Sequence, residues 1–129
     1  MAARLKARVA EIGMILCSTA KRTQQTAAYF TEAFENSASL QLYDELYHSS
    51  AQIMQSILTA TDENIHTIAV IAHNPGITAL ANHVADKVSI DNMPTCSIFS
   101  VTRKCSSWKE FFKEKAAFKF FIYPKDGKE

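Results

Sequence analysis

Two short stretches of this sequence place polar, reactive side chains directly after apolar runs. In ILCSTAKRTQQTA, Ser18 and Arg22 follow one run, and in VIAHNPGI, His73 and Asn74 follow another. An Arg guanidinium binds phosphate oxygens through two parallel hydrogen bonds, and an imidazole can donate a hydrogen bond or carry a proton. These residue types together indicate a site for a phosphoryl group.

The first stretch predicts a strand that turns into a helix. Residues 14–17 are uniformly apolar, and the oxygens of Ser18 and Thr19 are suited to cap the helix that follows. Arg22 then lies in the opening turn, where a cation opposes the positive end of the helix dipole, and a bound anion would relieve that conflict. The alternative is that Arg22 and Lys21 belong to a solvated face.

The second stretch predicts the same arrangement with a histidine at the joint. Residues 65–72 read as a strand and residues 77–86 as a helix, with Asn74 as its cap and Pro75 at the first helical position. His73 would thus be held beside a helix N-terminus, at the carboxyl end of a strand where ligands bind in open α/β sheets. The alternative is a hydrogen-bonded structural histidine.

Strands alternate with helices along the rest of the chain. The opening residues have helical periodicity up to a helix stop at Gly13, LQLYDELY reads as a strand, and Ser49 with Gln52 forms a capping box for another helix. Two strand-like runs, CSIFSVTR and AFKFFIYP, are joined through Trp108 and predict at least one antiparallel strand. We therefore expect a single α/β domain over residues 1–129 with a mostly parallel sheet.

Composition excludes several classes of protein. A chain of 129 residues that is 47% hydrophobic can bury a core, and its formal charge of +1 without a basic stripe argues against a nucleic-acid partner. No apolar run is long enough for a membrane helix or typical of a targeting signal. An odd number of cysteines without a CxxC pair favours a reducing cytoplasm; they are Cys17, Cys96 and Cys105.

No pattern in the sequence calls for a metal or a cofactor. His48, His66 and His83 have neither metal-site spacing nor a setting like that of His73, so we interpret them as structural. Cysteine-dependent phosphatases wrap a longer, glycine-containing loop between thiolate and Arg. Only four residues separate Cys17 from Arg22, and none of them is Gly, which argues against that chemistry.

The two stretches resemble the second and third motifs of the histidine phosphatase superfamily, and their close spacing is similar to its phosphohistidine phosphatase SixA branch. NMPTCSIFSVT and FFIYPK resemble the same branch, so the similarity covers nearly the whole chain. The resemblance implies a three-layer α/β/α, phosphoglycerate mutase-like fold with a mixed, mostly parallel sheet. It also implies that Arg22 and His73 hold the phosphoryl oxygens, together with the backbone around Ser18 and Asn74.

One motif of that family does not occur in these 129 residues. In the family, a histidine in an Arg-His-Gly motif at the end of the first strand attacks the phosphoryl group and is transiently phosphorylated. The triplet is absent here, and the chain opens in a helix with no cap, so we expect the first strand to be missing. The family often has a proton donor where Asp44 and Glu45 lie; Glu45 is our candidate, with an exposed loop carboxylate as the alternative.

Two functions therefore remain open. One is a phosphatase for phosphohistidine proteins or small phosphomonoesters, whose catalytic strand lies outside this sequence. The other is a non-catalytic phosphate-binding module or pseudo-phosphatase that keeps Arg22 and His73. Without the strand, we expect the chain to close its sheet with its own strands, to borrow an edge from a second copy as a dimer, or to be part of a longer protein.

Overall fold

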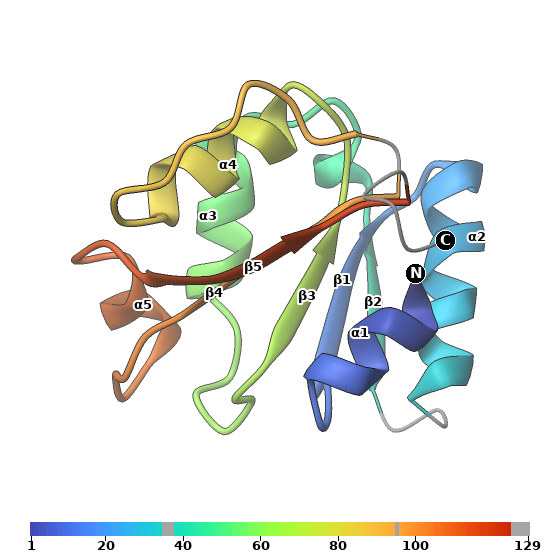
Figure 1. The fold of residues 1–129 in the computed structure, drawn as a ribbon, viewed down its shortest axis with the longest axis horizontal. Helices are drawn as coiled ribbons and strands as arrows, with labels where there is room; N and C mark the ends of the chain where they lie inside the picture. The colour runs from blue at the N-terminus through green and yellow to red at the C-terminus, as the bar shows by residue number, and fades with distance from the viewer. Residues whose placement is uncertain (35–37, 95, 125–129) are drawn as a thin grey trace. The chain divides into compact units, whose positions relative to one another are not determined.

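The computed structural model describes residues 1–34, 38–94 and 96–124 (Figure 1). The chain divides into two compact units. One comprises Ala2–Ser49 and Asn64–His73, and the other comprises Ser50–Glu63 and Asn74–Glu129 together with Met1. The first contains a parallel sheet and the second a helical cluster with an antiparallel pair of strands.

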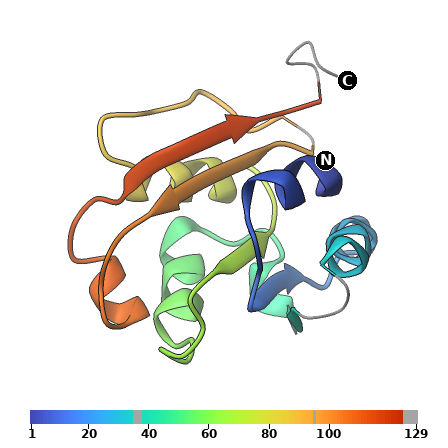
Figure 2. The ribbon, with the colours of Figure 1, turned by 60° about the horizontal axis from the view of Figure 1, so that its bottom comes forward.

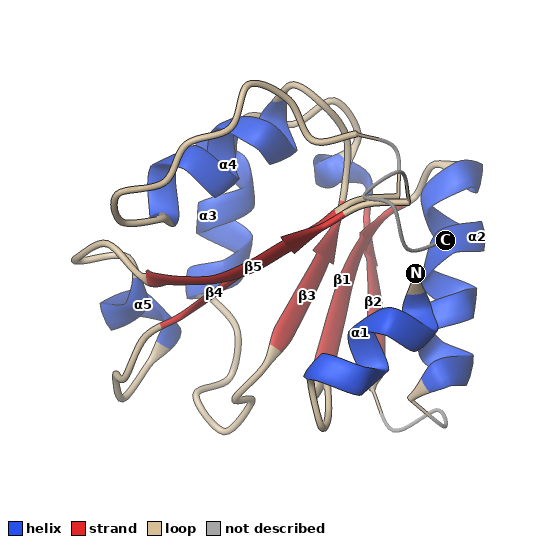
Figure 3. Ribbon diagram, in the orientation of Figure 1, coloured by secondary structure: helices blue, strands red, loops and turns tan. Residues whose placement is uncertain are grey.

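The sheet of the first unit has three strands in the order β2-β1-β3. They are β1 (Met14–Ser18), β2 (Ser39–Tyr43) and β3 (Ile68–Ile71). Both neighbours run parallel to β1, so the three arrowheads in Figure 3 point to the same edge of the sheet. Every carboxyl end therefore opens at that edge.

The central strand supplies the core of this unit. Ile15 and Cys17 are fully buried and Leu16 is 2% exposed, as expected for a strand covered on both faces. By contrast, β2 lies at one edge of the sheet, and its Leu42 is 47% exposed. The apolar strand β1 is therefore the central strand, and both neighbouring strands pair with it.

Two helices accompany the sheet. Helix α2 (Lys21–Ala33) contacts β1 and buries Thr23, Ala27 and Phe30, whose spacing places them on one helical face. Helix α1 (Ala2–Arg8) packs against α2. A short 3₁₀ helix, η1 (Asp44–Leu46), follows β2 and buries its Leu46.

Gly13 has a different role from the predicted helix stop. Helix α1 already ends at Arg8, and Gly13 instead begins the sheet ladder. Its N–H donates to the Thr67 carbonyl at 3.0 Å, and its carbonyl accepts from the Ser39 N–H at 3.0 Å. A Cβ at this position would lie 3.1 Å from the Ile65 side chain, so the close approach of the backbone favours glycine.

The second unit combines three helices with two strands. Helix α3 (Ala51–Thr59) packs against α4 (Gly76–Val84) and α5 (Trp108–Phe111). The strands β4 (Ile98–Thr102) and β5 (Ala117–Ile122) pair in opposite directions, as Figure 2 shows. The expected antiparallel strand is therefore confirmed, and so is the mixed α/β class.

Several predicted boundaries are wrong by a few residues. The cap of α3 is Ser50 rather than Ser49: the Ser50 hydroxyl accepts from the Ile53 N–H at 3.3 Å. Ser49 is buried, and its hydroxyl donates to the Leu46 carbonyl in the preceding turn and not to the start of α3. Strand β3 and helix α4 are each shorter than the runs 65–72 and 77–86 suggested.

In the described part of the chain, no helix has the length and apolar content to cross a membrane.

Replacing Leu16 by Ala should destabilise the protein by about 2–5 kcal/mol, because it leaves a cavity in the central strand. The matched control is Leu42→Ala on the neighbouring strand, which removes the same atoms from an exposed site and should cost less than about 0.5 kcal/mol. Urea unfolding monitored by circular dichroism measures both. Equal losses would show that β1 is not the core strand.

Candidate functional site

The carboxyl ends of the three parallel strands bring most of the predicted site residues to one edge. Ser18 is the last residue of β1, Glu45 lies in η1 directly after β2, and His73 follows β3 by two residues. The register pairs Ser18 with Tyr43 and Cys17 with Ile71, so the strands end level with one another. All of these residues belong to the first unit.

A side-chain hydrogen bond joins the two motifs. Nε2 of His73 lies 2.9 Å from Oγ of Ser18, a residue with no exposed surface. Oγ of Ser18 also accepts from the Ala20 N–H at 3.2 Å. No other hydrogen bond involves the His73 ring among the described residues, so Nδ1 is left for a ligand.

The start of helix α2 differs from the predicted capping. Its cap residue is Ala20, which has no side-chain hydrogen bond to offer, and Ser18 binds the Ala20 N–H in the preceding turn. The Thr23 hydroxyl lies 2.9 Å from the Ser18 carbonyl and 2.8 Å from that of Ala20. Without a side-chain cap, the first-turn N–H groups of α2 remain suited to bind an anion.

Arg22 lies in that first turn and is exposed. Its guanidinium makes no hydrogen bond or ion pair with any residue in the ranges that the structure describes; only its backbone carbonyl is engaged, by Thr26. A cation at the positive end of a helix dipole is unfavourable on its own. Arg22 is therefore available to bind an anion at the same edge as Ser18 and His73.

Two residues that the sequence did not single out lie beside His73. The ring of Tyr47 is 5.3 Å from the His73 ring, and that of His48 is 5.9 Å away. His48 adopts a left-handed backbone with φ of 55°, and its ring meets Tyr47 edge to face at 4.4 Å. Interpreting His48 as having no comparable setting is therefore wrong. The only signal in the sequence for the position of His48 near His73 is that it lies just after residues 44–46, at the same strand end as Glu45.

This environment shifts the protonation of His73. Burial lowers the pKa of His73, and the charge of nearby His48 lowers it further. Both effects favour the neutral ring, because the charged form would lose hydration and face a like charge. A bound anion would act in the opposite direction.

Glu45 and Asn74 are less directly tied to this cluster. Glu45 is exposed on η1, which the buried Leu46 anchors. Asn74 does not cap helix α4, whose cap residue is Pro75 with no side-chain hydrogen bond. Its Oδ1 accepts from the Thr78 hydroxyl at 2.5 Å and its Nδ2 donates to the Met93 carbonyl at 2.9 Å, so both amide atoms are engaged in the loop. A phosphate contact from Asn74 stays a prediction that rests on its backbone N–H.

Cys17 is unsuited to nucleophilic chemistry. Its thiol is buried and donates to the Ser18 carbonyl at 3.2 Å. Burial raises the pKa of Cys17, outweighing a hydrogen bond with Thr23 that lowers it, so little thiolate forms near neutral pH.

Comparison with solved structures identifies the fold. A protein assigned as phosphohistidine phosphatase SixA from Nakamurella multipartitia matches with a TM-score of 0.81 and 22% identity, covering 96% of this chain and 77% of that one. The protein histidine phosphatase SixA in complex with tungstate gives 0.77 and 23%, covering 95% and 76%. A third such protein, from Agrobacterium tumefaciens, gives 0.75 and 20%, covering 95% and 75%.

These likenesses confirm the phosphoglycerate mutase-like α/β fold that the motifs predicted. No protein-family model matches the chain, and no curated protein matches it by sequence. The structural comparison therefore establishes the fold, and the chemistry depends on the residues at the strand ends.

Replacing His48 by Asn should raise the pKa of His73 toward the ordinary histidine value of about 6.5, because one of the two causes of its depression is removed. In the native chain, the stability from neutral His73 should be present above that value and decline as the pH falls. Proton NMR titration of the ring measures the pKa.

His66→Asn is the matched control, since His66 is an exposed histidine of the same unit. It should leave the titration of His73 unchanged. An unshifted His73 pKa in the His48 variant would contradict the proposed coupling between the two rings.

Proposed function

We propose that this chain is the phosphoryl-binding part of a SixA-type histidine phosphatase acting on phosphohistidine or on a small phosphomonoester. The observation that carries the proposal is the hydrogen bond between Ser18 and His73 at the sheet edge where helix α2 begins, with Arg22 in its first turn. The resemblance of both motifs to the superfamily and the shared fold support it. One structural neighbour binds tungstate, a tetrahedral oxyanion like phosphate.

Each residue has a distinct proposed role. The Arg22 fork donates two charge-assisted hydrogen bonds to phosphoryl oxygens, and the first-turn N–H groups of α2 add further donors. Ser18 positions the His73 ring through Nε2, so that Nδ1 faces the ligand. The backbone N–H of Asn74 is the fourth contact that we propose.

The covalent step requires a second histidine. In the family, the phosphoryl group moves from the substrate to the histidine of Arg-His-Gly and then to water. No such triplet occurs in these 129 residues. We propose that turnover depends on a segment with that triplet in addition to this sequence, and that His73 binds the phosphoryl group rather than attacking it.

Glu45 is the proposed proton donor to the leaving group. It lies at the end of β2, on the same sheet edge as Ser18 and His73, and its exposed carboxyl group is accessible to a substrate. The substrate would be a phosphohistidine protein or a phosphorylated small molecule, because the proposed contacts are to the phosphoryl group. A non-catalytic phosphate-binding module is the second candidate, and the absent triplet favours it.

The proposal also covers the oligomeric state and the cellular location of the protein. Strand β3 forms one edge of the described three-stranded sheet, where a strand from a second copy would add in a dimer. Free cysteines at positions 17, 96 and 105 favour the reducing cytoplasm as the location.

Replacing Arg22 by Ala should weaken the binding of phosphate or vanadate more than His73→Ala does. Arg22 can donate two charge-assisted hydrogen bonds, worth about 1.5–3 kcal/mol each, whereas the imidazole supplies one bond. Titration calorimetry on both variants measures the difference.

The matched control is Lys21→Ala, which removes the same charge from the same helical turn. Its effect should be small, because Lys21 is not the proposed ligand. Negligible losses in all three variants would instead place Arg22 on a solvated face.

The 129-residue chain should have little or no activity on phosphohistidine or p-nitrophenyl phosphate, whereas a version extended by a strand ending in Arg-His-Gly should hydrolyse both. In the extended version, Glu45→Gln should lower turnover of phosphomonoesters with a poor leaving group by about a hundredfold or more. Asp44→Asn, on the adjacent exposed carboxylate, is the matched control.

Robust turnover by the unextended chain that His73→Ala abolishes would contradict this assignment. His73 would then be the nucleophile. An inactive extended chain that still binds vanadate would support the phosphate-binding module instead.

A further inference from the structure

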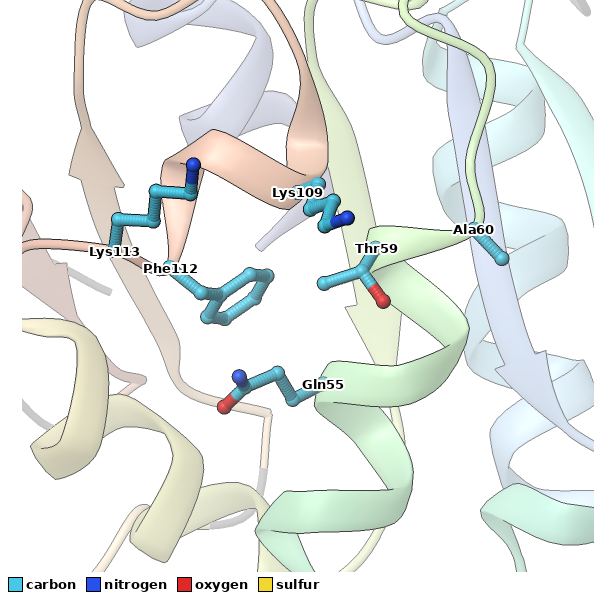
Figure 4. Close-up of a pocket in the computed structure, with 6 residues that line it drawn as sticks. All are labelled: Gln55, Thr59, Ala60, Lys109, Phe112 and Lys113. Atoms are coloured by element: carbon cyan, nitrogen blue, oxygen red, sulfur yellow. The ribbon is translucent and has the colours of Figure 1, made fainter.

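A surface pocket of about 430 Å³ lies within the second unit, between α3 and the segment that includes α5. Figure 4 shows the side chains of this pocket, which we call the α3–α5 pocket, with the Phe112 ring in the middle of the set. Its lining consists of Gln55, Thr59, Ala60, Lys109, Phe112 and Lys113. None of these residues belongs to the proposed phosphoryl site.

The pocket combines an apolar floor with unused polar groups. Phe112 is half-buried and presents its ring between polar side chains. The Thr59 hydroxyl donates to the Ser56 carbonyl at 3.0 Å, so its oxygen can still accept a hydrogen bond. The Gln55 amide has no hydrogen-bond partner among the described residues, and it can both donate and accept.

Two lysines line the same pocket. Lys109 and Lys113 are exposed and separated by four positions, and neither ammonium group makes a hydrogen bond or an ion pair within the described ranges. Residues 103–119 contain six Lys or Arg and two Glu, a net charge of +4, although the whole chain carries only +1. The overall charge therefore conceals a local excess of positive charge in the segment that supplies both pocket lysines.

The two glutamates of the segment are already engaged. Glu110 accepts from the Ser106 hydroxyl at 2.9 Å and from its N–H at 3.4 Å, and these bonds lower the pKa of Glu110 more than the charge of Lys113 does. Glu114 pairs with Arg103 at 2.9 Å. Neither carboxylate forms an ion pair with the pocket lysines, which leaves their charges for a partner.

We propose that the α3–α5 pocket docks an acidic segment of a protein partner. An apolar side chain of that segment would pack on Phe112, while acidic residues on either side would pair with Lys109 and Lys113. Two separate ammonium groups around one aromatic ring suit carboxylates that flank an apolar residue, as in a peptide, better than the single anionic group of a small metabolite. Gln55 is placed to hydrogen-bond the backbone of the bound segment.

The test uses a fluorescein-labelled peptide with glutamates flanking one phenylalanine, and fluorescence anisotropy with the intact 129-residue chain. The double variant K109E/K113E should weaken binding at least about tenfold, because both charge pairs become repulsive. The matched control K104E/K119E makes the same change of net charge at exposed lysines outside the pocket. It should cost no more than about twofold, since exposed charges at a distance are screened by salt.

Two further experiments test whether the pocket recognises the apolar residue of the acidic segment. A peptide with serine in place of phenylalanine should bind at least about fivefold more weakly, because the contact with Phe112 is lost. In the unmodified chain, NMR should show that the peptide perturbs the Gln55 side-chain amide and the Phe112 ring first. This readout does not depend on whether any variant folds.

Several results would overturn the proposal. Equal weakening in both double variants would mean that the peptide senses net charge alone, and absence of binding would mean that the pocket is not a docking site. A single-stranded DNA oligonucleotide that competes as well as the peptide would identify the surface as a nucleic-acid site. All of these outcomes are independent of phosphatase activity.

Discussion

Burial of β1 along its length imposes the arrangement on which the candidate site depends. A strand without access to water must pair its backbone N–H and C=O groups with neighbours on both sides. Strands β2 and β3 provide that pairing, and both run parallel to β1. Because parallel strands end at the same edge of a sheet, Ser18, η1 and His73 are brought together although 55 positions separate the first from the last.

The charged groups at that edge underlie the proposal that it binds an anion. Arg22 has no ion-pair partner in the described ranges, and the first turn of α2 has no side-chain cap. Burial lowers the pKa of His73, and the charge of nearby His48 lowers it further. An oxyanion would relieve the unfavourable position of Arg22 and favour protonation of His73, which couples ligand binding to the charge state of the site.

Charge is distributed unevenly along a chain that is nearly neutral overall. The excess positive charge of residues 103–119 includes both lysines of the α3–α5 pocket, and the acidic side chains of that segment are satisfied locally by Ser106 and Arg103. Net charge alone argued against a polyanionic partner. It says nothing of a local surface suited to a few carboxylates, since exposed charges act over about 10 Å at moderate ionic strength.

Local sequence determined the strands and the helices, and it indicated the residues that we propose for phosphate binding. The apolar run of β1, the helical spacing in α2 and the motifs around Arg22 and His73 each depend on neighbours within a few residues. For this reason the α/β fold was predictable. Small local choices were less so: Ser49 and Ser50 are equally good caps by type, and only burial of Ser49 against the Leu46 carbonyl decided between them.

Tertiary structure alone decided which distant groups meet. The positions of Tyr47 and His48 beside His73 follow from the end of β2 lying level with the end of β1, which no local pattern encodes. The hydrogen bond from the Asn74 amide to the Met93 carbonyl likewise depends on where a later loop returns. Side-chain types and spacing predict what chemistry is available. Which hydrogen bonds are already made within the fold decides which groups remain free for a ligand.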